Sequence, residues 1–125
     1  MVNFEMIGGP MKEKDHLAYL TGYEMSNIAD KFNEYAGEKF LGFLPQAKEY
    51  KLFQRSDNYS FYQEFKIPAQ TISTFDFTNY EYYHHVSDEM QYINIPHMVN
   101  LIESAVPGIK GIINSAEKEI KMTEE

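Results

Sequence analysis

The sequence predicts an α/β domain in which helices flank a layered, mostly parallel sheet. Short apolar segments typical of buried strands alternate along the chain with segments whose apolar residues recur at helical spacing. Such alternation favours parallel strands that are joined by crossover helices. The chain has 125 residues, of which 43% are hydrophobic, and this suits one domain with a substantial core.

Three segments are predicted to be strands. Residues 2–7 form a short apolar run that stops at Gly8-Gly9-Pro10, and residues 16–22 form a second run after a polar connector. Residues 69–75 follow Pro68 and are rich in residues that favour strands. The stretch from 40 to 53 is ambiguous, because Pro45 breaks it and residues 50–53 suit a short strand.

Three segments are predicted to be helices. Ser26 is placed to cap the first helix, and Gly37 is placed to end it. Its apolar face comprises Ile28, Ala29, Phe32, Tyr35 and Ala36. A short helix over residues 59–64 would start after Ser56 or Asp57 and stop before Pro68.

A C-terminal helix is predicted from Pro96, which suits a first helical turn. Its apolar stripe comprises Met98, Leu101, Ile102, Ala105, Ile109, Ile112 and Ile113. Pro107-Gly108 is expected to kink or interrupt this helix, and residues 118–125 form a charged tail. Between the last predicted strand and this helix, residues 75–90 form a long loop rich in aromatic and ionisable groups, a composition typical of functional loops.

Composition limits the classes of partner. The net charge of −8 opposes binding to nucleic acid, because the chain has no basic patch to neutralise phosphates. No cysteine is present, which excludes disulfides and thiolate metal sites. The chain contains no apolar run of about 18 residues, so no membrane span is expected. The N-terminal residues lack the layout of a signal peptide, and the compartment is left open.

The most informative chemistry lies in the predicted loop. His84 follows an aromatic run, and Asp88 lies four residues beyond it. An imidazole nitrogen can bind a metal ion, and a nearby carboxylate can orient the ring and set its tautomer. Together with Glu5 at the end of the first strand, this segment suggests part of a metal-dependent hydrolase.

Four segments, in this order and spacing, resemble the M28 metallopeptidases, the group of zinc aminopeptidases and glutaminyl cyclases. They are Asn3-Phe4-Glu5-Met6-Ile7-Gly8; Tyr19-Leu20-Thr21-Gly22-Tyr23-Glu24; Arg55-Ser56-Asp57-Asn58-Tyr59-Ser60-Phe61-Tyr62 with Ile67-Pro68-Ala69; and Phe75-Asp76-Phe77 with Tyr82-Tyr83-His84 and Asp88. The resemblance covers nearly the whole chain but only the second half of the family's catalytic domain. We therefore expect residues 1–125 to be the C-terminal portion of a phosphorylase/hydrolase-like zinc exopeptidase domain whose first half is absent.

The resemblance implies a site with two metal ions, usually zinc, that an aspartate bridges. By motif, Glu5 takes the position of an acidic ligand and His84 that of a histidine ligand, while Asp57 and Asp88 would orient loops or ligands. The family's H-x-D and E-E motifs, which belong to the first half of the domain, have no counterpart here apart from Glu124-Glu125 in the tail. Glu5 stands where many members have aspartate, and Asn58 replaces a common histidine.

Each of these residues also has a plainer interpretation. Glu5 could be a buried acid that pairs with a neighbour, and His84 could bond to a backbone carbonyl in its loop. Asp57 could simply be a helix N-cap. The aromatic residues Phe75, Phe77, Tyr80, Tyr82 and Tyr83 are expected to wall a specificity pocket for an apolar or aromatic N-terminal residue, and the alternative is ordinary loop packing. The predicted substrate pocket comprises Phe75, Tyr82, Tyr83 and His85.

Three functions follow as hypotheses. The first is part of a zinc aminopeptidase that removes N-terminal residues from peptides and is inactive as this isolated chain, with weak or no zinc. The second is a glutaminyl cyclase-like acyltransferase with one zinc ion, and the third is a non-catalytic binding module that retains the fold. An exposed sheet edge is expected to cause self-association. Members of the family are often exported or periplasmic.

Overall fold

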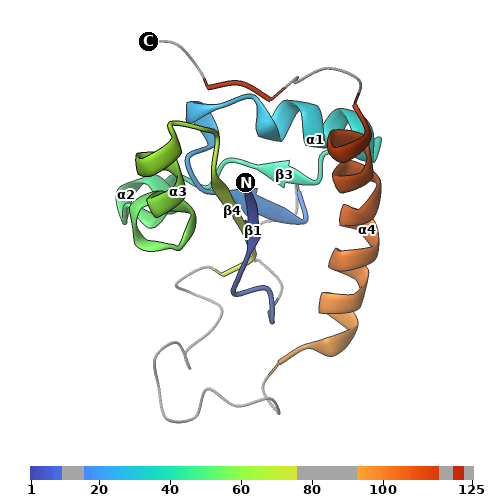
Figure 1. Cartoon of the computed structure of the whole chain (residues 1–125). Coiled ribbons are helices and arrows are strands. Elements are labelled where there is room, and N and C mark those ends of the chain that lie inside the picture. The colour runs from blue at the N-terminus through green and yellow to red at the C-terminus, as the bar shows by residue number, and fades with distance from the viewer. Residues whose placement is uncertain (10–15, 76–92, 116–119, 123–125) are drawn as a thin grey trace.

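A four-stranded sheet with helices on both sides forms the centre of the molecule (Figure 1), as predicted. The structure is a computed structural model that describes residues 1–9, 16–75, 93–115 and 120–122. The strands are β1 (Val2–Phe4), β2 (Ala18–Leu20), β3 (Leu41–Gly42) and β4 (Gln70–Ser73). The three segments predicted to be strands, 2–7, 16–22 and 69–75, each form one, although each strand is shorter than its segment.

The sheet is mixed but mostly parallel, with the strand order β1-β4-β2-β3. β1 runs parallel to β4, and β2 runs parallel to β3, while β2 and β4 are antiparallel. In this register Asn3 lies beside Thr71. β1 and β3 are the two edge strands, so the carboxyl ends of β1 and β4 lie side by side next to an open edge.

Helix α1 (Ile28–Ala36) matches the predicted first helix at both its apolar face and its end. Gly37 adopts the left-handed conformation with φ 75°, and its N–H donates to the Asn33 carbonyl at 3.0 Å. The cap position is Asn27 and not Ser26, which corrects the prediction. Ser26 is buried and extended, and its hydroxyl donates to Gln70 at 2.5 Å while accepting from the Ile28 N–H.

The segment from 40 to 53 differs from the predictions. Pro45 begins helix α2 (Pro45–Glu49), because the first helical turn needs no N–H from that residue. Residues 50–53, which suited a short strand, do not form one: Lys51 adopts φ 56° and turns the chain into the 3-10 helix η2 (Leu52–Arg55). A second 3-10 helix, η1 (Tyr23–Met25), precedes α1.

Helices α3 (Asn58–Phe65) and α4 (Ile95–Asn114) complete the fold. Pro96 lies in the first turn of α4 as predicted, and the Asn94 side chain caps that turn by accepting from the His97 N–H at 3.0 Å. The helix runs without interruption through Pro107, so the predicted interruption does not occur. The turn of α4 that follows Pro107 packs closely against α1, because the backbone of Gly108 lies on the ring of Phe32.

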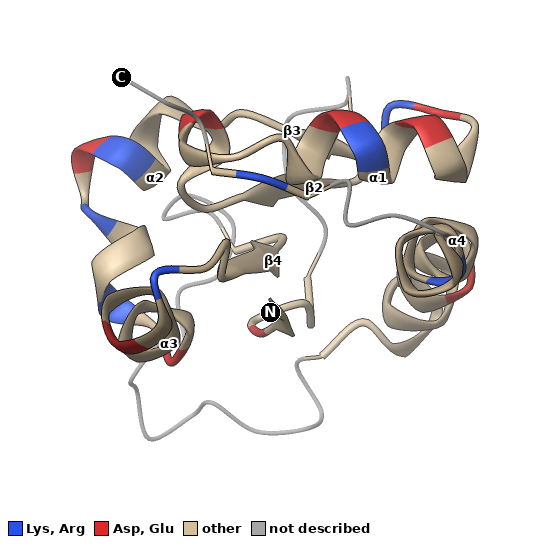
Figure 2. Ribbon diagram, turned by 45° about the horizontal axis from the view of Figure 1, so that its top comes forward, with Lys and Arg blue, Asp and Glu red and all other residues tan. Residues whose placement is uncertain are grey.

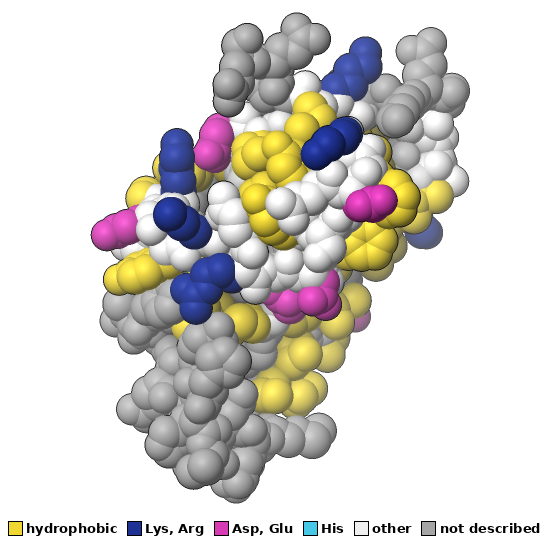
Figure 3. Space-filling view, turned by 60° about the vertical axis from the view of Figure 1, so that its left-hand side comes forward, with side chains coloured by type: hydrophobic (Ala, Val, Ile, Leu, Met, Phe, Trp, Pro, Cys, Tyr) yellow, Lys and Arg dark blue, Asp and Glu magenta, His cyan; other side chains and the backbone are white. Residues whose placement is uncertain are grey.

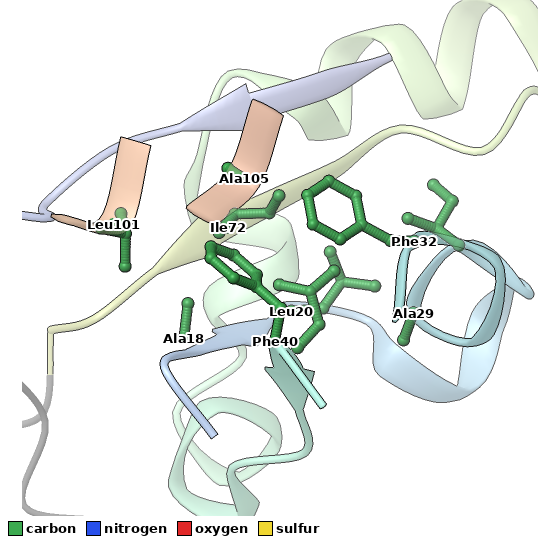
Figure 4. Packing of buried hydrophobic residues seen from close by; sticks show 10 residues of the cluster. Ala18, Leu20, Ala29, Phe32, Phe40, Ile72, Leu101 and Ala105 are labelled. Carbon is green, nitrogen blue, oxygen red and sulfur yellow. The ribbon is translucent and has the colours of Figure 1, made fainter. Parts of the chain in front are cut away.

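The main hydrophobic core lies between the sheet, α1 and α4 (Figure 4). Phe32 and Phe40 pack there with their ring centroids 5.2 Å apart, beside Ile72 of β4 and Leu101 of α4. A smaller cluster forms between the sheet and α2, where Tyr19 of β2 packs with Ala47 of α2. The predicted stripe of the C-terminal helix is therefore only partly core, because Ile102 and Ile113 are exposed.

Helices α1 and α2 carry most of the helical charge, whereas the 20 residues of α4 include two charged side chains, Glu103 and Lys110 (Figure 2). The side of the molecule that carries α2 and α3 has lysine and acidic side chains around exposed hydrophobic ones (Figure 3). Within the described residues, no helix is long and apolar enough to cross a membrane.

The end of α3 offers a test of backbone strain. Lys66 occupies the left-handed position that Gly37 occupies in α1, with φ 54°, and its N–H donates to the Tyr62 carbonyl at 3.0 Å. A non-glycine residue in this conformation costs about 1 kcal/mol. We expect Lys66→Gly to raise the free energy of unfolding by about 0.5–1 kcal/mol in urea denaturation. Gly37→Ala should lower it by a similar amount, and an unchanged midpoint for both variants would contradict the assignment.

Candidate functional site

A small cleft of about 40 Å³ lies where β1 and β4 end. Glu5 follows β1, and Phe75 follows β4, while the loop before α3 closes another side with Arg55 and Ser56. The wall is completed by Met6, Tyr19, Thr21, Leu52, Thr71 and Ser73. Functional groups of α/β domains gather at the carboxyl ends of parallel strands, and this cleft occupies that place.

Glu5 is positioned by its backbone and by its neighbour two residues earlier. Its N–H donates to the Ile72 carbonyl at 3.2 Å, which extends the β1–β4 pairing by one step. The Asn3 amide donates to the Glu5 carboxylate at 3.5 Å, the long limit of a hydrogen bond. Glu5 is half-buried and its carboxylate has this weak partner, so the carboxylate oxygens can still bind a further group.

Behind Glu5, a chain of hydrogen bonds joins β1, β4 and α3. The Asn3 amide also donates to the Thr71 hydroxyl at 3.1 Å, and that hydroxyl donates to the Asn58 carbonyl oxygen at 2.7 Å. The Asn58 amide donates to the backbone carbonyls of Ala69 at 2.9 Å and Phe53 at 3.3 Å. Because Asn58 is completely buried, these bonds anchor the wall on which Glu5 is mounted.

The residue after Glu5 has a strained backbone. Met6 adopts φ 55°, which is uncommon for a residue other than glycine. Its carbonyl accepts from the N–H of Thr74 at 3.4 Å and from the Ser73 hydroxyl at 3.3 Å. These bonds hold the strained turn and fix the direction in which the chain leaves the cleft. Backbone strain of this kind gathers at functional sites.

The predicted site residues divide into three groups. Glu5 and Phe75 line the same cleft, and Phe75 is buried there. Asp57 stands at the N-cap position of α3 as predicted, but its exposed side chain makes no capping bond and does not line this cleft. The other predicted residues lie outside the described part of the chain: Tyr82, Tyr83, His84, His85 and Asp88.

The described residues do not form a metal centre by themselves. Within residues 1–9, 16–75, 93–115 and 120–122, no three histidine or acidic side chains gather closely enough to hold an ion. The described histidines, His16 and His97, do not line the cleft with Glu5. A catalytic zinc ion needs three protein ligands, so one carboxylate is at most a fraction of such a site.

The residues behind Glu5 were not recognised from the sequence as one unit. Asn3 precedes Glu5 by two positions, and strand periodicity could have placed both side chains on one face. The partnership of Asn3 with Thr71 depends on the register of β1 against β4, which the sequence does not reveal. Asn58 stood out only as a departure from the family's histidine, and its packing against β4 is a tertiary feature.

These features define a layered α/β domain whose polar cleft and acidic side chain lie at the carboxyl ends of parallel strands. The chain belongs to peptidase family M28, whose family model matches residues 1–106. Its function is therefore of the peptidase type, in a family whose members are generally metallopeptidases. Searches among curated proteins and among solved structures each found no match.

Proposed function

We propose that this chain is the C-terminal portion of a zinc-dependent exopeptidase domain that hydrolyses N-terminal residues from peptides. The observation that carries the proposal is the position of Glu5, half-buried at the carboxyl ends of β1 and β4 and held from behind by Asn3 and Thr71. A carboxylate on a rigid strand end suits a metal ligand, because its direction is set before the ion binds.

The remaining roles in this proposal follow the family's motifs. His84 supplies the imidazole ligand, and Asp88 and Asp57 orient their loops. Phe75 contributes an apolar wall beside Glu5, in keeping with its place in the cleft. Tyr82, Tyr83 and His85 complete a pocket for the side chain of the peptide's N-terminal residue. Hydrolysis needs a general base and further metal ligands, so we propose that the isolated chain is inactive and binds zinc weakly.

Metal analysis of the purified protein at neutral pH tests the proposal. We expect that any zinc bound above the level of a metal-free control is lost in both Glu5→Ala and His84→Ala. Glu64→Ala removes an exposed acid from α3 and serves as the matched control, with no expected loss. Zinc that persists in both site variants would contradict the assignment of the two ligands. A complete lack of zinc at high zinc concentration would favour the binding-module hypothesis.

We also propose that the open edge of β1 takes part in self-association. Among the described residues, β1 has a neighbouring strand on one side only, and an edge strand presents unpaired backbone groups to other chains. Light scattering across a range of protein concentrations would test this proposal. A monomer at the highest concentration would contradict it.

A further inference from the structure

Helix α4 carries a second apolar stripe, which lies beside the buried one and is mostly exposed. Its first stripe, built around Leu101, Ala105 and Gly108, is buried against α1 and the sheet. The second comprises Ile95, Val99, Ile102, Val106, Ile109 and Ile113. Of these, all but the half-buried Ile109 are between 42% and 72% exposed. In Figure 1, α4 runs along one side of the molecule.

The spacing of this stripe is that of a helix-to-helix seam. Its successive members are separated by four, three, four, three and four residues, the alternation that places side chains along one line of a supercoiled pair of helices. A groove of about 360 Å³ runs beside the stripe, between α4 and the residues Phe4 and Ile7 of the β1 segment. The groove is almost wholly apolar in its lining and gives room for side chains of a second helix.

The charges that border the stripe favour a second copy of the same chain. Glu103 and Lys110 are the only charged residues of α4, and both follow a stripe residue directly, on the same flank. When two copies of a helix pack antiparallel, this flank faces its own counterpart. With Val106 opposite Ile109 of the second copy, Ile102 lies opposite Ile113, and Glu103 comes within about 3 Å along the axis of Lys110. The two-fold symmetry makes this ion pair twice.

A parallel pair lacks this complementarity. In that arrangement the flank with Glu103 and Lys110 faces the opposite flank of the partner helix, which carries Met98, Ala105 and Ile112. Both charges would then border uncharged groups. We propose that the exposed stripe of α4 binds a second copy of this chain, with the two helices antiparallel in the register that places Val106 opposite Ile109. The proposal is independent of the peptidase chemistry and of pairing through β1.

Engineered cysteines test the register, because the natural chain contains no cysteine. Ile102→Cys and Ile113→Cys are each prepared alone and then mixed in equal amounts under mild oxidation. We expect a disulfide between the two variants in the mixture, identified by tryptic peptides because Lys110 separates the two positions. Each variant alone should stay uncrosslinked, since its own thiols lie about 16 Å apart along the axis. Phe65→Cys, 61% exposed on α3, is the control that should crosslink with neither.

Charge reversal provides the second test. Glu103→Lys or Lys110→Glu alone places like charges together at both symmetric positions, and we expect each to weaken dimerisation by about tenfold in sedimentation equilibrium. The double variant Glu103→Lys/Lys110→Glu restores the pairs and should dimerise like the natural chain. Because both residues are exposed, thermal melts of all variants should coincide when measured as monomers.

Three results would overturn the proposal. One is a monomeric natural chain at about 100 μM, a concentration at which a weak dimer of this kind is populated. Another is crosslinking of Ile102→Cys with itself as fast as with Ile113→Cys, which indicates a parallel pair. The third is a dimer that neither crosslinks in the mixture nor responds to charge reversal, because such a dimer uses another surface, such as the edge of β1.

Discussion

Asn58→Ala is expected to lower the free energy of unfolding by about 3 kcal/mol, because it removes the central member of a buried polar network. Asn58 is completely buried and accepts from Thr71 while donating to the carbonyls of Ala69 and Phe53. Alanine leaves these three groups without their partner in a site that excludes water. Each unsatisfied buried group costs about 1–3 kcal/mol before any relaxation. Urea denaturation followed by circular dichroism measures the effect.

Two comparisons sharpen this test. Asn100→Ala removes an exposed asparagine from α4 and should change stability by less than about 0.5 kcal/mol. Asn58→His introduces the residue common in the family, and its neutral ring has one donor and one acceptor, so it should recover part of the loss. A loss for Asn58→Ala no larger than that for Asn100→Ala would show that the network does not hold α3 to β4.

Gly108→Ala is expected to destabilise the protein by about 2 kcal/mol, although alanine is the better helix former. A Cβ atom at Gly108 would stand 2.6 Å from a carbon of the Phe32 ring, which is fully buried between α1 and the sheet. Overpacking of a filled core costs about 1–3 kcal/mol, whereas the gain in helix propensity is at most about 1 kcal/mol. The steric term therefore outweighs the gain, and thermal or urea denaturation would show a lower midpoint.

A double variant identifies the cause of this loss. Phe32→Leu is destabilising by itself because it leaves a cavity, but it also removes the ring carbons that the new methyl group would meet. In that background, Gly108→Ala should be neutral or stabilising, and the two effects should be strongly non-additive. Equal losses in both backgrounds would contradict a direct clash and would point instead to the backbone of α4.

The sequence predicted elements well where the signals are local. Gly37 ends α1 because a left-handed residue is needed there, and Pro96 begins α4 because the first turn needs no N–H. The failures lie where a local signal has two outcomes. Pro45 was expected to break a segment and instead begins α2, and Pro107 leaves α4 uninterrupted. Residues 50–53 also suited a short strand, but the left-handed Lys51 leads the chain into the 3-10 helix η2.

The candidate site shows the same division. The motifs placed Glu5 at a strand end, and the structure brings it together with Phe75 across 70 residues of chain. The motifs did not reveal how Glu5 is held, because Asn3, Thr71 and Asn58 come from separate segments whose polar groups meet only in the folded state. A sequence motif identifies the side chains that take part in chemistry, but it does not identify the buried groups that position them.

By itself the sequence determined the alternation of strands and helices, the family and the acidic residue at the end of β1, because each depends on residues close together in the chain. Only the tertiary structure decided the register of β1 against β4, the buried bonds of Asn58 and the close packing of Gly108 on Phe32. It also decided which of the two apolar stripes of α4 is buried. These features depend on contacts between distant segments, and local patterns of polarity and spacing do not encode which segments will meet.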